Sequence, residues 1–377
     1  MILLVGASLL IRSFSRIVAV DPGFDAARIL HGRVALNASY NEAGTRVFFD
    51  QVVQKMREIP GVEAVGISSH IPINGQTGVG AFPIRGSTPG QEDVFPTASV
   101  IGVSPDYFSA MRISLLEGRA FNAADLLPQA RRVLIVDRTF AAKFFPGRSA
   151  VGEGFLDNGA NAKPDSWPLI VGVAEVVKYN GPEDRSGLPL VYVPMGASGG
   201  LSIELRTDRP MADIVPRMRA ALRSLDPALP LYSVGTMQMA VDGALANRRG
   251  VMWLLGAFAG VALLLSAVGI YGMLAYDVAQ RTREIGIRGA IGASRGQIVT
   301  LILRQGLWKT GVGLVIGLGG AFYLSRYMGS LLFEVKPTDP FAFIGVSLLL
   351  LLVALLASWL PARRAAKIDP VIALRAE

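Results

Sequence analysis

The sequence predicts a membrane protein in which three transmembrane α-helices follow a large α+β domain outside the membrane. Three apolar runs carry this prediction, at about 251–276, 307–329 and 341–360, and the first contains no charged residue. Runs of this length without charge are typical of helices that span a bilayer. Residues 21–249, which precede the first run, instead alternate short strand-like and helix-like patterns, as a folded domain does.

The N-terminal segment, residues 1–20, begins with an apolar stretch that ends at Ile11. Eleven residues of helix measure about 16 Å, roughly half of the hydrocarbon core of a bilayer. The stretch lacks the basic start and small-residue cleavage site of a signal peptide. We therefore expect residues 1–20 to be the C-terminal part of a first transmembrane helix, truncated in this chain, and its exit from the membrane. A short interfacial anchor is the alternative.

The distribution of Lys and Arg orients the helices. The loop between the first two runs is rich in arginine, and Arg363 and Arg364 follow the third run, whereas residues 331–340 hold one lysine and two acidic residues. Short basic loops stay in the cytoplasm, so residues 21–249 are expected outside. From Asp21 to Gly250 the chain has 23 Lys+Arg and 23 Asp+Glu, so the net charge of +8 comes from the membrane-flanking segments. This pattern argues against a nucleic-acid partner.

The outer domain is expected to have two lobes. Strands are predicted at 29–36, 62–68, 169–177, 201–206 and 231–234, and helices at 45–59 and 211–225. Two strand–helix–strand units at opposite ends suggest one α+β lobe from about 28–70 and 166–235. The stretch 71–165, richer in Gly and Pro, would be an inserted lobe. A further helix at 236–249 is predicted to run into the first span.

Several motifs suggest enzymatic or metal sites, but none has the expected context. Ser198 and Ser294 both lie in Gly-x-Ser-x-Gly sequences, yet neither has the strand–turn–helix setting of a nucleophile elbow, and chance matches are expected in a chain with 42 glycines. The two histidines, His31 and His70, lack a second ligand at metal spacing, so a satisfied surface or strand-end role is expected. The chain has no cysteine and no P-loop motif. We expect a non-enzymatic chain without cofactor or metal.

Glycines inside the predicted spans allow helices to approach closely. Gly256 and Gly260 form one Gly-x-x-x-Gly motif in the first span, and Gly313 and Gly317 form another in the second. These four residues predict helix packing, either with a second subunit or among the chain's own helices. No charged residue lies in the span interiors, at 251–276, 310–325 and 341–360, which argues against a proton- or ion-coupled carrier.

The order of these segments, and several local sequences, resemble the FtsX/MacB-like permeases of ABC transporters. The resemblance rests on the inner loop that begins Arg281-Thr-Arg-Glu-Ile-Gly-Ile-Arg and on the tail that begins Leu360-Pro-Ala-Arg-Arg. In the outer domain it rests on Val103-Ser-Pro-Asp-Tyr-Phe, Leu116-Glu-Gly-Arg-Ala-Phe and Phe144-Phe-Pro-Gly, which look like a MacB-type periplasmic core. The opening Leu-Leu-Val-Gly-Ala-Ser-Leu-Leu-Ile-Arg-Ser-Phe looks most like the second half of the acidobacterial-type duplicated permeases.

The resemblance implies a permease subunit, residues 250–377 being FtsX-like, that couples a cytoplasmic ABC ATPase to the outer domain, for efflux or export. It places the chain in a bacterial inner (plasma) membrane, with the large domain extracytoplasmic and ATP bound by the partner. A dimer, or pairing with a similar permease half, would follow. The alternative is a membrane-anchored sensor or adhesion protein without ATPase coupling.

The inner loop is the predicted ATPase-coupling site. We expect an amphipathic helix along the membrane surface, with its charged residues toward the partner or lipid head groups and with Ile285 and Ile291 toward apolar surface. The glycines would leave room for close contact. The alternative is that the arginines only fix the topology. The coupling residues are Arg281, Arg283, Glu284, Ile285, Gly286, Arg288 and Gly292.

Overall fold

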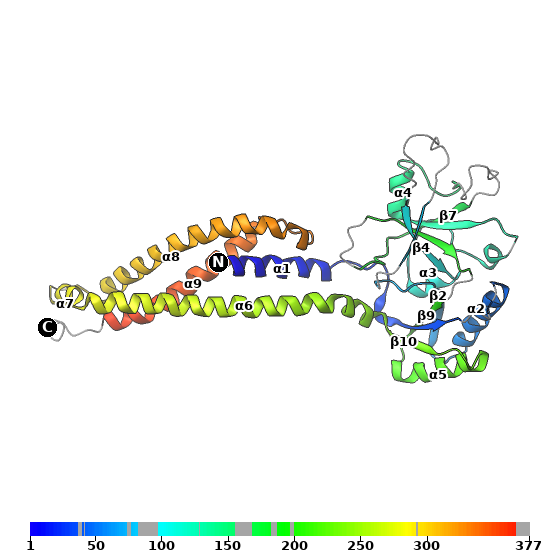
Figure 1. The fold of residues 1–377 in the computed structure, drawn as a ribbon, viewed down its shortest axis with the longest axis horizontal. Helices are drawn as coiled ribbons and strands as arrows, with labels where there is room; N and C mark the ends of the chain where they lie inside the picture. The colour runs from blue at the N-terminus through cyan, green and yellow to red at the C-terminus, as the bar shows by residue number, and fades with distance from the viewer. Residues whose placement is uncertain are drawn as a thin grey trace. The chain divides into compact units, whose positions relative to one another are not determined.

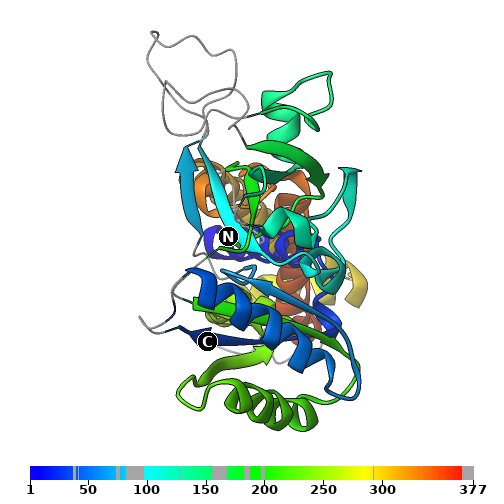
Figure 2. The same cartoon turned by 90° about the vertical axis from the view of Figure 1, so that its right-hand side faces the viewer.

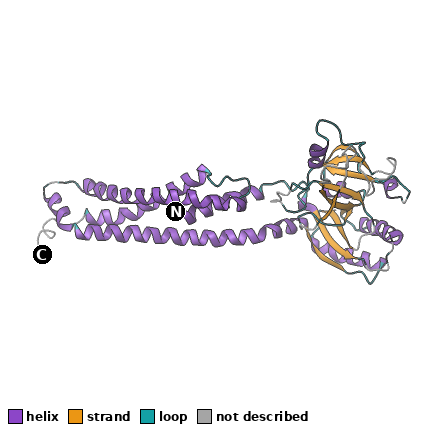
Figure 3. Ribbon diagram, turned by 45° about the horizontal axis from the view of Figure 1, so that its top comes forward, coloured by secondary structure: helices purple, strands orange, loops and turns teal. Residues whose placement is uncertain are grey.

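The structure, a computed structural model, describes residues 1–36, 40, 42–73, 77–81, 97–127, 129–154, 168–181, 187–196, 200–291 and 293–366. The chain divides into two compact units. One comprises Met1–Ala19 with Asn247–Glu377, and the other comprises Val20–Ala246. Among the described residues strands occur only in the second unit, and the first is built from helices (Figure 3). We refer to them as the membrane unit and the outer domain.

The described part of the outer domain is built on one sheet of ten strands. Their order is β10-β1-β9-β2-β4-β8-β6-β7-β5, with β3 paired to β4 at the side. The strands are β1 (Ile29–Ala35), β2 (Val62–Ser68), β3 (Gly78–Ala81), β4 (Thr97–Val103), β5 (Leu115–Gly118), β6 (Val133–Asp137), β7 (Leu169–Ala174), β8 (Leu190–Pro194), β9 (Gly200–Thr207) and β10 (Leu231–Thr236). The helices are α2 (Glu42–Arg57), α3 (Tyr107–Met111), α4 (Arg138–Phe144) and α5 (Met211–Leu225), with 3₁₀ turns η1 (Ala26–Arg28) and η2 (Ala123–Leu126).

Successive side chains of β9 point to opposite faces of the sheet, and different residues are buried on the two faces. Leu201, Ile203 and Leu205 point to one face, where they form a core with the apolar sides of α2 and α5. These two helices lie side by side on that face (Figure 2). The intervening residues Glu204 and Arg206 point to the opposite face and are buried there. Thus β9 is covered on both sides, and one of its covered faces is polar.

The sheet corrects the expected division of the domain into lobes. β7, which we assigned to the first lobe, pairs with β6 in parallel and with β5 antiparallel. β8 pairs with β4 and β6. Both strands therefore lie with the segment we called inserted, and one continuous sheet joins the two parts. Strand pairing between segments far apart in the chain is a tertiary property that local pattern does not encode.

The membrane unit contains α1 (Ile2–Val18), α7 (Thr282–Ala290), α8 (Arg295–Ser325), η4 (Arg326–Leu331), α9 (Pro340–Ala365) and, from Asn247 onward, α6 (Met237–Gln280), which begins in the outer domain. Three helices in the described part of the chain are long and apolar enough to cross a membrane, at Arg248–Gln280, Arg295–Gly329 and Pro340–Ala365. The predicted fold class is thus confirmed: three long apolar helices accompany an α+β domain. The predicted helix at 236–249 and the first span form one continuous helix, α6 (Figure 1).

α1 packs with α8 and α9. Leu4, Val5 and Leu9 are buried in a core that includes Ala321 of α8 and Val346 of α9. At the outer end Arg12 forms an ion pair with Asp339, 2.9 Å long, and lies over the ring of Phe341. Asp339 therefore compensates the charge of Arg12 at this end of the helices.

Candidate functional site

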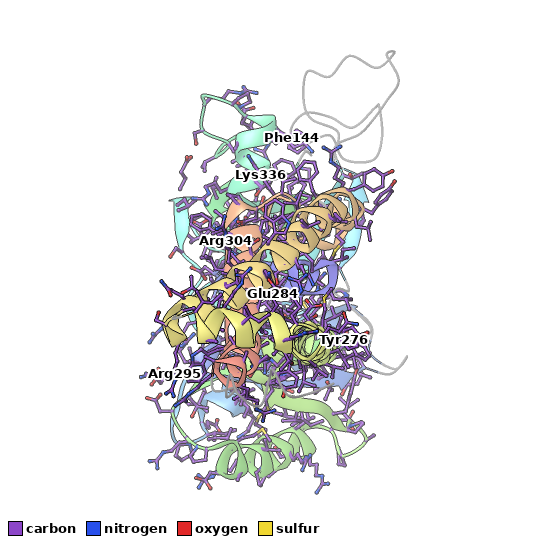
Figure 4. All side chains as sticks on the ribbon, turned by 90° about the vertical axis from the view of Figure 1, so that its left-hand side faces the viewer. Phe144, Tyr276, Glu284, Arg295, Arg304 and Lys336 are labelled. Carbon is purple, nitrogen blue, oxygen red and sulfur yellow. The ribbon has the colours of Figure 1, made fainter. Side chains whose placement is uncertain are left out.

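The inner loop forms a short helix between the inner ends of α6 and α8. α6 ends at Gln280, where the amide of Arg281 still reaches the carbonyls of Asp277 and Val278 at 3.2 Å. The hydroxyl of Thr282 donates to the carbonyl of Ala279 at 2.8 Å, so α7 starts with almost no linker. Figure 4 looks onto this end of the helices, with Glu284 and Arg295 labelled.

Ile285 anchors α7 to the rest of the membrane unit. Its side chain is 8% exposed and packs in a core with Ile298 and Ile302 of α8 and with Ala362 and Ala365 of α9. Burying one isoleucine side chain contributes about 1.5–3 kcal/mol. α7 is therefore fixed to α8 and α9, and a force applied to α7 will reach those helices as well as α6.

The charged residues of α7 face solvent. Arg281, Arg283, Glu284 and Arg288 are all exposed. Glu284 and Arg288 form an ion pair of 2.8 Å across one helical turn, with about half of each side chain exposed. Such a pair contributes only about 0.3–0.5 kcal/mol, so it can be exchanged for contacts with a partner at little cost.

Two isoleucines of the loop are exposed as well. Ile287 is 41% exposed and Ile291 is 81% exposed. Ile285 faces an apolar surface within the chain, whereas Ile291 lies in the turn after α7, which ends at Ala290, and its predicted contact with an apolar surface stays a prediction. The crevice between α7 and the ends of α6 and α8 has a volume of about 20 Å³, little more than a water molecule needs. The loop therefore offers a mixed charged and apolar surface for a macromolecule, and this crevice is too small for a metabolite.

The surroundings of two predicted coupling residues, Gly286 and Gly292, are not described. Gly286 lies within α7, but its surroundings lie outside the description. Gly292 lies outside the described residues. The structure thus places Arg283, Glu284, Ile285 and Arg288 on one short helix, with Arg281 in the turn just before it.

The glycines of the spans fall into two groups. A Cβ added at Gly317 would lie 2.7 Å from the Met1 side chain, so this glycine serves packing of α1 on α8. A Cβ at Gly256, Gly260 or Gly313 would meet no described atom within 4 Å. Gly306, which the motif search missed because it lies outside the predicted Gly-x-x-x-Gly pairs, would place a Cβ 2.9 Å from Ser358 Oγ and is where α8 and α9 approach closely.

The Gly-x-Ser-x-Gly sequence at Ser294 has a structural role. The Ser294 hydroxyl accepts a hydrogen bond from the amide of Gln297, and the Gln297 side chain accepts one from the amide of Ser294. This reciprocal pair is a capping box that starts α8. Ser198 lies outside the described residues. No group of three potential metal-binding side chains occurs among the residues described.

The polar face of the outer-domain sheet holds residues that the sequence reasoning missed. Glu204 is fully buried; the Ser68 hydroxyl donates to its Oε1 at 2.7 Å, and its Oε2 has no described partner. Burial raises the pKa of Glu204 to about 8. Arg206 lies on the same face, where its guanidinium pairs with Asp25 at 2.8 Å. In the sequence, the signal for this face was the pair of charged residues Glu204 and Arg206 at alternate positions of a predicted strand.

His31 also lies on this face and corrects an expectation. It pairs with Glu204 in the register of β1 and β9 and is 5% exposed. Its Nδ1 has no partner among the described atoms, whereas we expected a satisfied histidine at the surface or at a strand end. Burial lowers the pKa of His31, and the nearby Arg33 lowers it further. His70 does lie just after a strand, where its Nδ1 is 2.9 Å from the Ser69 hydroxyl.

Comparison with known proteins agrees with this architecture. Residues 3–221 match the MacB-like periplasmic core domain, and residues 256–370 match the FtsX-like permease C-terminal family. The chain is 30% identical over 294 residues to the uncharacterized ABC transporter permease YknZ of Bacillus subtilis, covering 74% of this chain and 70% of YknZ.

Two macrolide export ATP-binding/permease proteins, both MacB, are also similar. The protein from Rhodospirillum rubrum is 30% identical over 78% of this chain, and the protein from Salmonella choleraesuis is 30% identical over 73%. The chain spans 45% and 43% of their lengths. With a MacB-like periplasmic core and three long apolar helices in an FtsX-like C-terminal part, the chain belongs to the MacB/FtsX-type family of ABC transporter permeases.

Proposed function

We propose that α7 is the surface on which a cytoplasmic ABC ATPase docks, and that the chain transmits the ATPase cycle to the outer domain for efflux or export. An ABC transporter permease implies an ATPase partner. The observation that supports α7 as the docking site is its combination of an exposed charged and apolar surface with the buried anchor Ile285. A docking helix must present contacts outward and pass force inward, and α7 has the residues for both.

α6 supports the transmission step. It is one helix of 44 residues, about 66 Å long, that starts at Met237 and ends one residue before α7. Met237 is fully buried in the core of the outer domain. Displacement of α7 can therefore reach the outer domain through a single hydrogen-bonded element. The middle of each span carries no charged residue, which suits a mechanical lever better than a polar path.

The docking surface can be tested by copurification. Detergent-solubilised chain carrying Glu284→Lys or Ile291→Ser should lose the bound ATPase and the ATP hydrolysis that copurifies with it. Arg295→Gln is the matched control, because Arg295 is exposed at the start of α8 but lies outside α7. Normal ATPase association in both α7 variants would reject α7 as the docking site. Absence of any ATPase from the unmodified chain would favour a sensor or adhesion protein.

We further propose that the chain pairs with a second copy or with a similar permease half, as in the duplicated permeases it resembles. Gly256 and Gly260 support this, since neither contacts another described helix. Gly260→Leu should reduce the dimer fraction in detergent, measured by mass photometry. Gly269→Leu is the control, because Gly269 is equally open but lies about 180° around the helix from Gly260. Equal effects of the two substitutions, or none, would exclude this face.

A further inference from the structure

An open groove runs along the surface of α8 near its cytoplasmic end, against Leu355 of α9. Its volume is about 870 Å³, and its lining is largely leucine, with Leu301, Leu307 and Leu355 among the residues. Trp308 lies in the groove and is 75% exposed. Among the described residues that line it, Arg304 carries the only charge. The groove therefore combines an apolar wall with a single cation.

The contact between α8 and α9 gives the depth of this groove in the membrane. The two helices run antiparallel, and Gly306 approaches Ser358 most closely. Two residues before Gly306 on α8, Arg304 is thus level with Leu360 on α9, where the apolar run ends before Arg363. Trp308 lies four residues farther along α8, about 6 Å deeper. Arg304 is consequently at the depth of the lipid phosphates, and Trp308 is at the depth of the glycerol and upper acyl chains.

Arg304 is the cation of the groove, and several other cations at this end of the helices are already paired. Lys309 pairs with Asp277, and Arg288 pairs with Glu284. The guanidinium of Arg364 donates to the hydroxyl of Tyr271 at 3.0 Å. Arg304 is exposed and forms no ion pair with a described residue (Figure 4). A guanidinium is well suited to bind a phosphate through two parallel hydrogen bonds.

We propose that this groove binds an anionic phospholipid of the cytoplasmic leaflet. Arg304 contacts the phosphate, the Trp308 ring lies against the glycerol region, and one acyl chain lies along the leucines. The charge of the groove favours an anionic lipid over a zwitterionic one, since no acidic residue of the described lining would attract a choline or ammonium group. The proposal depends on the membrane placement of the helices and is independent of α7 docking.

Fluorescence quenching by brominated lipids tests the proposal on the full chain. Trp167, Trp253 and Trp359 are replaced by Phe, which leaves Trp308 as the only tryptophan, because the chain has four. The protein is reconstituted in phosphatidylcholine vesicles that contain either brominated phosphatidylglycerol or brominated phosphatidylcholine at the same mole fraction. We expect phosphatidylglycerol to be enriched beside Trp308 by about 5-fold, the preference that one arginine near a membrane surface supplies.

Variants separate a specific site from general surface charge. Arg304→Gln should abolish the enrichment, and Arg304→Lys should retain most of it. Arg295→Gln is the matched control, because it removes a charge from the same helix outside the groove and should leave the enrichment intact. Equal quenching by the two brominated lipids would overturn the proposal. So would an equal loss in Arg295→Gln, or protection of Trp308 from both lipids, which would indicate that protein covers the groove.

Discussion

The buried carboxyl group of Glu204 should make the stability of the outer domain fall as the pH rises. Its pKa increases from the ordinary value of 4.5 to about 8 on folding, because burial penalises the charged form. The Ser68 hydroxyl and the backbone oppose this effect without cancelling it. Tyr107 and Tyr179, whose pKa values are raised by their own burial, and His31, whose pKa is lowered by burial, face Glu204, and Arg206 lies on the same face, where it pairs with Asp25.

The sign follows from proton binding in the two states. Between pH 4.5 and 8 the folded domain holds a proton on Glu204 that the unfolded chain releases, so each pH unit lowers the free energy of unfolding by about 1.4 kcal/mol. The contribution is fully present below pH 4.5 and is lost by about pH 8, with a total of about 5 kcal/mol. Between pH 6 and pH 8 the loss is about 2.3 kcal/mol, or about 50-fold in an opening equilibrium, because half of the folded molecules still hold the proton at pH 8.

Glu204→Gln isolates this effect. Glutamine keeps an oxygen that accepts the Ser68 hydrogen bond, but it does not titrate. The additional N–H donor of the glutamine amide lowers the free energy of unfolding by about 1–3 kcal/mol if it has no partner, and this loss does not vary with pH. The variant should therefore be less stable than the parent at pH 5 and should lack the slope above it.

Hydrogen exchange of the full chain in detergent measures the slope directly. Peptides covering β9 should lose about 50-fold of protection between pH 6 and 8 in the parent, after correction for intrinsic exchange, and should lose none in Glu204→Gln. Glu63→Gln serves as the control, because Glu63 is exposed on β2. Equal pH dependence in the parent and in Glu204→Gln would refute the reasoning.

Three further predictions concern the membrane unit and the topology. Asp339→Ala should lower the free energy of unfolding by about 1–2 kcal/mol, because Asp339 both pairs with Arg12 and caps α9 through the amide of Phe341. The loss should appear as a lower melting temperature in detergent. An unchanged melting temperature would mean that neither contact stabilises the unit. Gly306→Ala should destabilise the α8–α9 contact more than Gly311→Ala, which places a methyl group in open space, and the same melting experiment should separate the two. In the variant Ile291→Cys, a membrane-impermeant thiol reagent applied to sealed cells should leave the new cysteine unlabelled. Labelling from outside would reverse the predicted orientation. The chain has no native cysteine that would interfere.

The sequence by itself determined the membrane spans, their orientation and the inner helix. These features depend on local quantities, namely the length of an uncharged run, the bias of Lys and Arg between loops and the alternation of charged and apolar residues in a short segment. For the same reason α5 and β2 were predicted with the bounds they have, 211–225 and 62–68. Each of these properties is complete within a few turns of chain and needs no distant partner.

Only the tertiary structure decided which residues meet. The residues of β7 predict a strand but do not say which strand it pairs with. Its place beside β6 follows from long-range packing. Gly317 and Gly260 occupy equivalent positions in their motifs, yet α1 covers the first and no described helix covers the second. Glu204 could have faced solvent, and it is buried because α3 covers that face of β9. Burial and pairing depend on what lies across the contact, and that partner comes from another part of the chain.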